Sequence, residues 1–145
     1  CYINMLIKQL SVFLEDRSGR LTELTRILAE NDVNITALTV AETADYGMVR
    51  MVVGRPERAK NALENAGFTV GLTEVACVKM PDQPGSLHQI LQILTAEQIN
   101  VDYMYAFSNS NVALAVIRAS DISRLIGVLQ QHRLKLLSGN DLYQL

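Results

Sequence analysis

The sequence has few of the residues that mark several large classes of protein. Cys1 and Cys77 are its only cysteines, too few for a disulfide framework or a cysteine-rich zinc site. No apolar run approaches the roughly 18 residues that a membrane-spanning helix needs, and no signal-peptide pattern is present. We therefore expect a cytoplasmic protein with no metal site, no cofactor and no membrane partner.

The chain also has little net charge of either sign. Its formal charge at pH 7 is −2, so it has no basic field to attract a polyanion, and we expect no nucleic-acid partner. Of its 145 residues, 49% are hydrophobic and 19% are charged, as in an ordinary soluble globular protein of one or two small domains. Residues 1–4 do not contribute to the predicted fold.

The most informative feature is an internal repeat. The segment DRSGRLTELT at 16–25 has a counterpart 66 residues later, DQPGSLHQIL at 82–91. The same offset places VNI at 33–35 over INV at 99–101, and Phe68 over Leu134. We expect a slip of about one residue near the turn before Val112, where a loop absorbs a deletion at little cost. The chain is predicted to be two copies of one small unit that pack together.

Each copy is predicted to contain four strands and two helices. Alternating Leu10, Val12 and Leu14 are typical of a half-buried strand, whereas Leu21, Leu24 and Leu28 form the apolar stripe of an amphipathic helix. In the first copy we expect strands at 6–15, 34–42, 48–54 and 68–72, with helices at 20–31 and 58–66. In the second copy we expect strands at 75–80, 101–108, 112–118 and 134–137, with helices at 86–98 and 122–132.

This element order predicts the fold class. Strand, helix, strand, strand, helix, strand with right-handed crossovers gives an α+β, ferredoxin-like unit, an antiparallel sheet with both helices on one face. Cys77 falls within a strand of the second copy, where we expect a small buried hydrophobe. Tyr103, Tyr105 and Phe107 fall on one face of another strand, where they are typical of packing between sheets or protomers.

The pattern of an apolar strand, D-x-x-G-x-L, an amphipathic helix and then VNI or INV resembles the ACT domain, a small-molecule-binding regulatory module. The resemblance covers essentially the whole chain from Met5. It implies two tandem ACT units, at 5–72 and 73–145, with no attached catalytic domain. It also implies amino-acid binding near the repeated loop, often between two units.

The chemistry of the repeated turn suits a zwitterion. Unpaired backbone N–H groups in the first turn of a helix bind a small anion such as a carboxylate. A glycine in such a turn allows positive φ and lets a ligand approach the backbone. Asp16 or Asp82 can receive an α-ammonium group, and Asn34 or Asn100 offers both a donor and an acceptor. A free amino acid carries both of these charged groups.

The resemblance carries ligand-binding roles to specific positions of both copies. In the first copy the candidates are Asp16, Arg17, Ser18, Gly19, Arg20, Leu21, Asn34 and Ile35. In the second copy they are Asp82, Gln83, Pro84, Gly85, Ser86, Leu87, Asn100 and Val101. Because Arg17 and Arg20 are replaced by Gln83 and Ser86, we expect the two sites to differ in affinity or ligand preference.

Several alternatives remain open. Asp-x-x-Gly before a helix is also an ordinary turn and cap. An assembly module that binds no ligand fits the same fold. Acylphosphatase-like hydrolysis needs a loop arginine, for which Arg17 or Arg20 is available, but the second copy lacks it. RNA-binding relatives of this fold carry strand aromatics where this chain has Val12 and Met51.

The sequence therefore predicts a non-catalytic regulatory protein that binds a free amino acid or a similar small zwitterion. Its two histidines and the cysteine at mid-strand form no hydrolytic triad. With no effector domain in the sequence, its output must pass to a separate effector enzyme or to a change in association. Ligand loops near an open sheet edge favour a homodimer.

Overall fold

The computed structural model describes residues 5–15, 19–42 and 46–143. The candidates Asp16, Arg17 and Ser18 lie outside the described residues. The chain divides into two compact units. Here the N-terminal unit is Lys8–Thr73 with the segment that begins at Asn140, and the C-terminal unit is Glu74–Gly139 with the described residues before Lys8.

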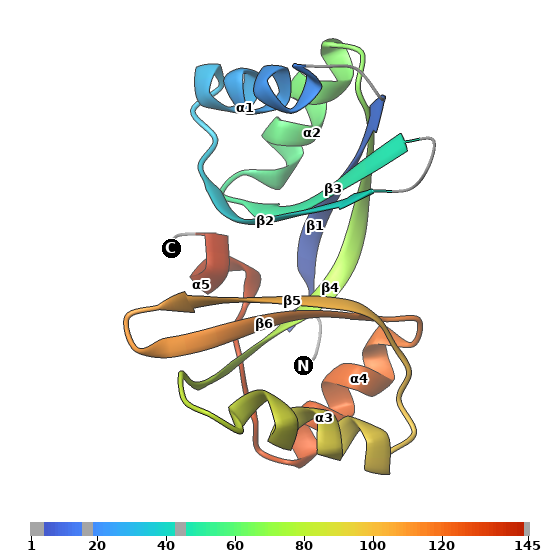
Figure 1. The fold of residues 1–145 in the computed structure, drawn as a ribbon, viewed down its shortest axis with the longest axis vertical. Helices are drawn as coiled ribbons and strands as arrows, with labels where there is room; N and C mark the ends of the chain where they lie inside the picture. The colour runs from blue at the N-terminus through green and yellow to red at the C-terminus, as the bar shows by residue number, and fades with distance from the viewer. Residues whose placement is uncertain (1–4, 16–18, 43–45, 144–145) are drawn as a thin grey trace. The chain divides into compact units, whose positions relative to one another are not determined.

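The N-terminal unit is a four-stranded antiparallel sheet with two helices on one face (Figure 1). Its strand order is β2-β3-β1-β4. The elements are β1 (Ile7–Glu15), α1 (Arg20–Glu30), β2 (Ile35–Glu42), β3 (Tyr46–Val53), α2 (Pro56–Asn65) and the first part of β4 (Thr69–Pro81). The predicted ferredoxin-like arrangement is confirmed.

The core of this unit follows from the two sequence periods. Leu10, Val12 and Leu14 alternate along β1 toward the helices, where they meet Leu24 and Leu28 of α1. These five side chains are at most 8% exposed. Truncating such a leucine to alanine removes about 2–5 kcal/mol of stability, because the lost apolar contacts leave a cavity. This packing holds the strand before the first ligand loop against the helix after it.

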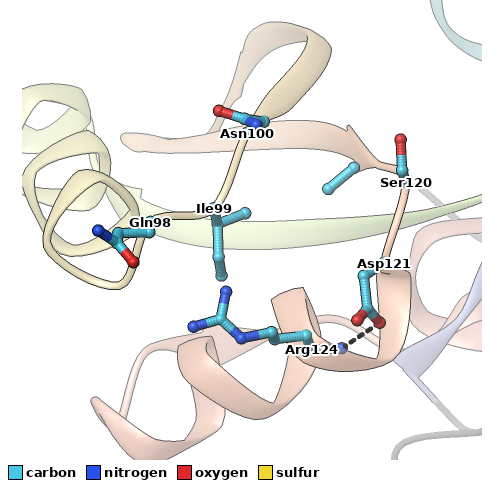
Figure 2. A pocket seen from close by; sticks show the side chains of 7 residues that line it. Gln98, Ile99, Asn100, Ser120, Asp121 and Arg124 are labelled. Atoms are coloured by element: carbon cyan, nitrogen blue, oxygen red, sulfur yellow. Dashed lines mark hydrogen bonds between the residues drawn. The ribbon is translucent and has the colours of Figure 1, made fainter.

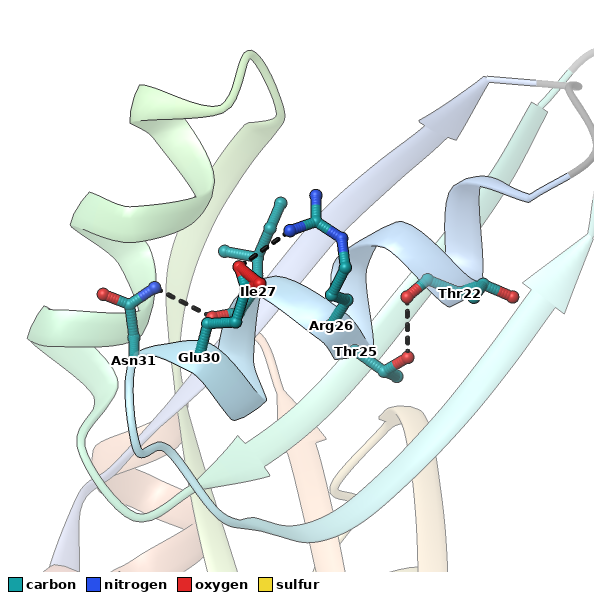
Figure 3. Close-up of polar contacts among 6 residues, drawn as sticks. All are labelled: Thr22, Thr25, Arg26, Ile27, Glu30 and Asn31. Carbon is teal, nitrogen blue, oxygen red and sulfur yellow. Dashed lines mark hydrogen bonds and ion pairs between the residues drawn. The ribbon is translucent and has the colours of Figure 1, made fainter.

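Helix α1 carries polar contacts along its outer side (Figure 3). Arg26 pairs with Glu30 one turn later at 2.7 Å, and the hydroxyl of Thr25 donates to the Thr22 carbonyl at 2.9 Å. The Asn31 amide donates to the carbonyl of Ile27 at 2.8 Å, which satisfies a carbonyl in the last turn. The helix ends at Glu30, and Asp32, two residues later, lies in the left-handed region at φ +58°.

The C-terminal unit repeats this arrangement in the order β7-β4-β6-β5. Its elements are the second part of β4, α3 (Ser86–Ala96), β5 (Val101–Asn109), β6 (Val112–Ala119), α4 (Ile122–Gln131) and β7 (Lys135–Leu136). Figure 1 shows α3 and α4 on one face of this sheet. Ile90 and Leu94 of α3 pack with Leu125 and Leu129 of α4 in its core.

The repeat is more regular than the sequence suggested. An offset of 66 residues places α1 on α3, β3 on β6 and α2 on α4, with identical element bounds in every pair. Asp32 and Gln98, at equivalent positions, both have φ of +58°. The predicted slip before Val112 is therefore wrong, and each residue of one copy can be compared directly with its counterpart.

One long strand replaces two predicted strands between the copies. We expected strands at 68–72 and 75–80, whereas β4 runs from Thr69 to Pro81 without a break. The intervening Thr73 and Glu74 carry no turn chemistry, and Gly71 lacks the positive φ that would mark a reversal. The residues of β4 up to Thr73 belong to the N-terminal unit, and the residues of β4 from Glu74 onward belong to the C-terminal unit.

The last described segment forms a short helix, α5 (Gly139–Tyr143), that the sequence did not predict. Leu142 is fully buried, and the Tyr143 hydroxyl accepts a hydrogen bond from the Lys8 backbone N–H at 2.8 Å. Burial raises the pKa of the Tyr143 phenol. A five-residue helix is unstable by itself, so these tertiary contacts hold it on the N-terminal unit.

Candidate functional site

Both ligand loops meet their helices through a glycine in a left-handed conformation. Gly19 has φ +87° and Gly85 has φ +90°, and each is the N-cap residue of the following helix. A Cβ at either position would meet no atom within 4 Å, so a substitution acts through backbone strain. The predicted positive φ is confirmed at both glycines.

In the C-terminal unit, the loop before α3 borders a pocket of about 230 Å³. Four candidates from the sequence line it: Asp82, Gln83, Ser86 and Leu87. The other walls come from the end of β4 and from β5 and β6: Met80, Pro81, Ala106, Phe107, Ser108 and Ala113. The loop side of this pocket is therefore polar, and most of its remaining wall is apolar.

Asp82 is the acidic group of this loop pocket. One of its carboxylate oxygens accepts a hydrogen bond from the Ser108 hydroxyl at 3.1 Å, which links the loop to the edge strand β5. The Asp82 backbone N–H donates to the carbonyl of Asn111 at 3.4 Å. The side chain of Asp82 remains exposed and keeps further lone pairs for a cationic donor.

The start of α3 offers backbone N–H groups, whose partial positive charge is opposite to the charge of the Asp82 carboxylate. No side chain caps this helix, because its N-cap residue is Gly85. N–H groups in a first helical turn lack partners within the helix and carry a partial positive charge. Ser86 itself is buried, and its N–H makes a long 3.4 Å contact with the Gln83 carbonyl. The pocket therefore has one carboxylate beside the start of a helix that no side chain caps.

Asn100 lies elsewhere in the same unit. It lines a second pocket of about 240 Å³ with residues from the α3–β5 and β6–α4 connections (Figure 2). The loop pocket lies at the start of α3, whereas Asn100 follows the end of that helix. The structure thus does not bring Asp82 and Asn100 of one unit into one pocket.

The remaining candidates of this copy lie outside both pockets. Pro84 and Gly85 are exposed in the loop and line neither pocket described here. Val101 begins β5, pairs with Ala119 of β6 and packs against the core.

In the N-terminal unit, Arg20 occupies the position of Ser86. Its side chain is 9% exposed, and its guanidinium carbon lies 4.0 Å from the centre of the Phe68 ring. One terminal nitrogen also donates to Glu23 at 3.1 Å. Its buried Nε–H has no hydrogen-bond partner among the described residues. Arg20 therefore joins the start of α1 to Phe68 by stacking, and its ion pair with Glu23 lies within the helix.

The other first-copy candidates are more accessible. Leu21 is 38% exposed and matches Leu87 at 37%, which places both leucines on the outer side of a helix start. Asn34 is exposed, and its carbonyl accepts a hydrogen bond from the Gly54 N–H at 2.9 Å. Ile35 begins β2 and packs against the core of the N-terminal unit.

Cys77 is fully buried, in agreement with its predicted role as a small hydrophobe. Burial raises the pKa of its thiol to about 12, because the thiolate would be desolvated. Within the described residues, no group of three His, Cys, Asp or Glu side chains is placed to hold a metal ion. In the same part of the chain, every helix is too short or too polar to cross a membrane.

Sequence reasoning missed the contribution of β5 to the loop pocket. Ala106 and Ser108 alternate with Phe107 along this strand, and all three line the pocket. The period-two pattern placed Phe107 on one face of the strand, but it did not predict that the loop before α3 lies close to this edge strand. Val40 stands in the first copy where the second has Ala106, so the small residue in the wall belongs to the second copy alone.

The family model for the ACT domain pair matches residues 5–145, nearly the entire chain. The protein therefore belongs to the ACT domain pair family, with two ferredoxin-like units in tandem. Among solved structures, it is similar to protein BT0572 from Bacteroides thetaiotaomicron at 45% sequence identity and a TM-score of 0.93. That match covers 97% of this chain and 98% of the other.

More distant structures share the fold. The regulatory subunit of aspartate kinase from Thermus thermophilus matches at 17% identity and a TM-score of 0.65, covering 88% of this chain and 94% of that one. Aspartokinase III from E. coli, solved with lysine and aspartate, matches at 14% identity and a TM-score of 0.52. That match covers 87% of this chain and 31% of the enzyme. No curated protein matches the chain.

Proposed function

We propose that this protein is a non-catalytic regulatory protein that binds a free amino acid at the loop pocket of its C-terminal unit. The supporting observation is the convergence of Asp82, the uncapped start of α3 and an apolar wall on one pocket of about 230 Å³. The carboxylate of Asp82 suits an α-ammonium group, and the helix N–H groups suit a carboxylate. The two charges of a zwitterion are therefore matched by opposite groups.

The pocket also restricts the ligand side chain. Met80, Leu87, Ala106 and Phe107 provide apolar surface, and no lysine or arginine of the described part of the chain lines the pocket. Its volume lies below the 300–1,000 Å³ of pockets that hold drug-sized molecules. We therefore favour an amino acid with a small or medium apolar side chain over a charged one.

The response is proposed to pass through association. Asp82 and Asn100 lie in different pockets of one unit, so we propose that a ligand bound by both residues takes them from two copies of the chain. Such a ligand stabilises the associated arrangement only by its higher affinity for it. We propose that a homodimer, or a separate effector enzyme, receives this signal.

A specific observation favours a second function, that of an assembly module without a ligand. Phe13 and Tyr46 are 44% and 43% exposed, and their ring centres are 5.4 Å apart. Exposed aromatic pairs are frequent in surfaces that bind other proteins. This pair belongs to the N-terminal unit, whereas the loop pocket belongs to the C-terminal unit.

Calorimetric titration with the twenty amino acids distinguishes the two functions. The ligand-binding function predicts saturable heat with at least one apolar amino acid and its loss in Asp82→Asn. Sedimentation with and without that amino acid then reports association. No heat with any of the twenty amino acids, together with a dimer that is disrupted by Phe13→Ser, would favour the assembly module.

A further inference from the structure

Apart from Asn100, the second pocket of the C-terminal unit is lined by groups that the proposed function does not use. Its lining comes from the turn after α3 and from the turn that begins α4: Gln98, Ile99, Asn100, Ala119, Ser120, Asp121 and Arg124. The volume is about 240 Å³. Figure 2 shows Arg124 extending from α4 toward Ile99, and Asp121 at the connection before α4 with its carboxylate directed toward the start of that helix.

Arg124 presents a positioned guanidinium group. One terminal nitrogen donates to the Glu97 carbonyl at 2.6 Å, which fixes the group at the C-terminus of α3. In Figure 2 the guanidinium lies beneath Ile99 and beside Gln98. The other N–H donors of Arg124 remain available, and Arg124 forms no ion pair with a described carboxylate.

Asp121 presents the opposite charge in the same pocket. One of its oxygens accepts a hydrogen bond from the backbone N–H of Arg124 at 3.1 Å, which caps α4. No described cation pairs with Asp121. The neighbouring Ser120 hydroxyl donates to Asp102 at 3.2 Å, so a second carboxylate lies directly behind the pocket lining.

An arginine and an aspartate that line one pocket without forming an ion pair leave room for a ligand that carries both charges. We propose that this pocket is a second site for a free α-amino acid. The guanidinium of Arg124 binds the α-carboxylate, Asp121 receives the α-ammonium group, and the Asn100 amide supplies a further donor or acceptor. This site goes beyond the proposed function and depends on Asp121 and Arg124 instead of Asp82.

The N-terminal unit provides an internal comparison. Asp32 and Arg55 stand where the C-terminal unit has Gln98 and Asp121, and these two residues pair at 3.6 Å. Gly54 replaces Ser120, and a Cβ there would lie 3.2 Å from the Tyr143 carbonyl oxygen. The charges are thus already paired and the chain's own C-terminal segment approaches closely. We expect no such site in this unit.

The test is a nuclear magnetic resonance titration of the full chain with each of the twenty amino acids at about 10 mM. At least one should move the backbone amide signals of residues 98–100 and 120–124 in a saturable manner. Its N-acetyl and carboxamide derivatives each lack one charge and should bind at least tenfold more weakly. If no amino acid moves these signals, the second site does not exist.

Variants separate this site from the loop pocket. Arg124→Gln should weaken binding at the amides of residues 120–124 at least tenfold while shifts at 82–87 persist, and Asp82→Asn should do the reverse. Arg58→Gln, at the equivalent position of the N-terminal unit, is the matched control and should change neither. Arg124→Lys keeps the positive charge and a donor for Glu97, so it should bind more tightly than Arg124→Gln. Equal losses in the two Arg124 variants, or none, would overturn the assignment.

Discussion

The Ser108 hydroxyl donates a hydrogen bond to Asp82 at 3.1 Å and so ties the ligand loop to the edge strand β5. Because both residues are exposed, the bond adds little to stability. Its role in the proposed mechanism is to orient the carboxylate toward the pocket.

Asp82→Asn should reduce amino-acid affinity at the loop pocket at least tenfold, because the amide cannot neutralise an ammonium group. Ser108→Ala should reduce it only a few fold, since the carboxylate remains but is less well oriented. Calorimetric titration of both variants measures the difference. Glu64→Gln removes an exposed carboxylate of α2 that pairs with Lys60, and it should leave affinity unchanged. Equal affinity of Asp82→Asn and the parent would contradict the role of Asp82.

Gly85→Val should abolish binding at the loop pocket while the protein still unfolds cooperatively. A β-branched residue at φ +90° is strained by about 1–3 kcal/mol, and no neighbouring atom blocks its Cβ. Gly19→Val should have the corresponding effect on any site of the N-terminal unit. Gly127→Ala is the control, because Gly127 lies in α4 with open space around it. The free energy of unfolding of this control should rise by about 0.5–1 kcal/mol, and its ligand affinity should stay unchanged. Unchanged binding in both valine variants would show that the loops do not bind the ligand.

Arg20→Ala should lower the free energy of unfolding by about 1–2 kcal/mol, measured by urea denaturation, because the stacked guanidinium and its buried stem are lost. Arg20→Met keeps most of the apolar contact, so its free energy of unfolding should fall less than that of Arg20→Ala. Arg26→Ala breaks only an exposed pair with Glu30 and should change stability by at most about 0.5 kcal/mol. If Arg20→Ala and Arg26→Ala are equally stable, the contact with Phe68 is not stabilising.

Cys77 should make stability fall in alkaline solution. Its thiol pKa is about 12 in the folded protein and 9.0 ordinarily, so the unfolded chain binds fewer protons between these pH values. The contribution is therefore complete below about pH 9 and is lost as the pH rises toward 12, by up to about 1.4 kcal/mol per pH unit. Urea denaturation at about pH 8 and about pH 10.5 should show the parent's stability relative to Cys77→Ala falling by about 2 kcal/mol. A constant difference would contradict the burial of the thiol.

Much of the fold was predictable because its signals are local. The leucine stripe of α1, the alternation of β1 and the glycines before both helices each depend on neighbours in sequence. Because the sequence repeats after 66 residues, the same elements could be predicted in both copies. The sequence suggested a slip near Val112, yet the described helices α1 and α3, strands β3 and β6, and helices α2 and α4 keep one offset of 66 residues.

The features that were missed depend on tertiary contacts. α5 has five residues and is held by the burial of Leu142 and by the bond from Lys8 to Tyr143. The continuity of β4 depends on pairing with strands of both units, not on the composition around Thr73. Likewise, the separation of Asp82 from Asn100 follows from the length of α3 between them, about 16 Å for 11 residues at 1.5 Å each.

Thermal unfolding with each of the twenty amino acids at millimolar concentration tests the central claim, that the protein binds an amino acid. A ligand at about 100 times its dissociation constant adds roughly 2.7 kcal/mol, a rise in Tm of about 5–10 °C for a chain of this size. We expect such a rise with at least one apolar amino acid. If Tm stays constant with all twenty, the protein does not sense free amino acids.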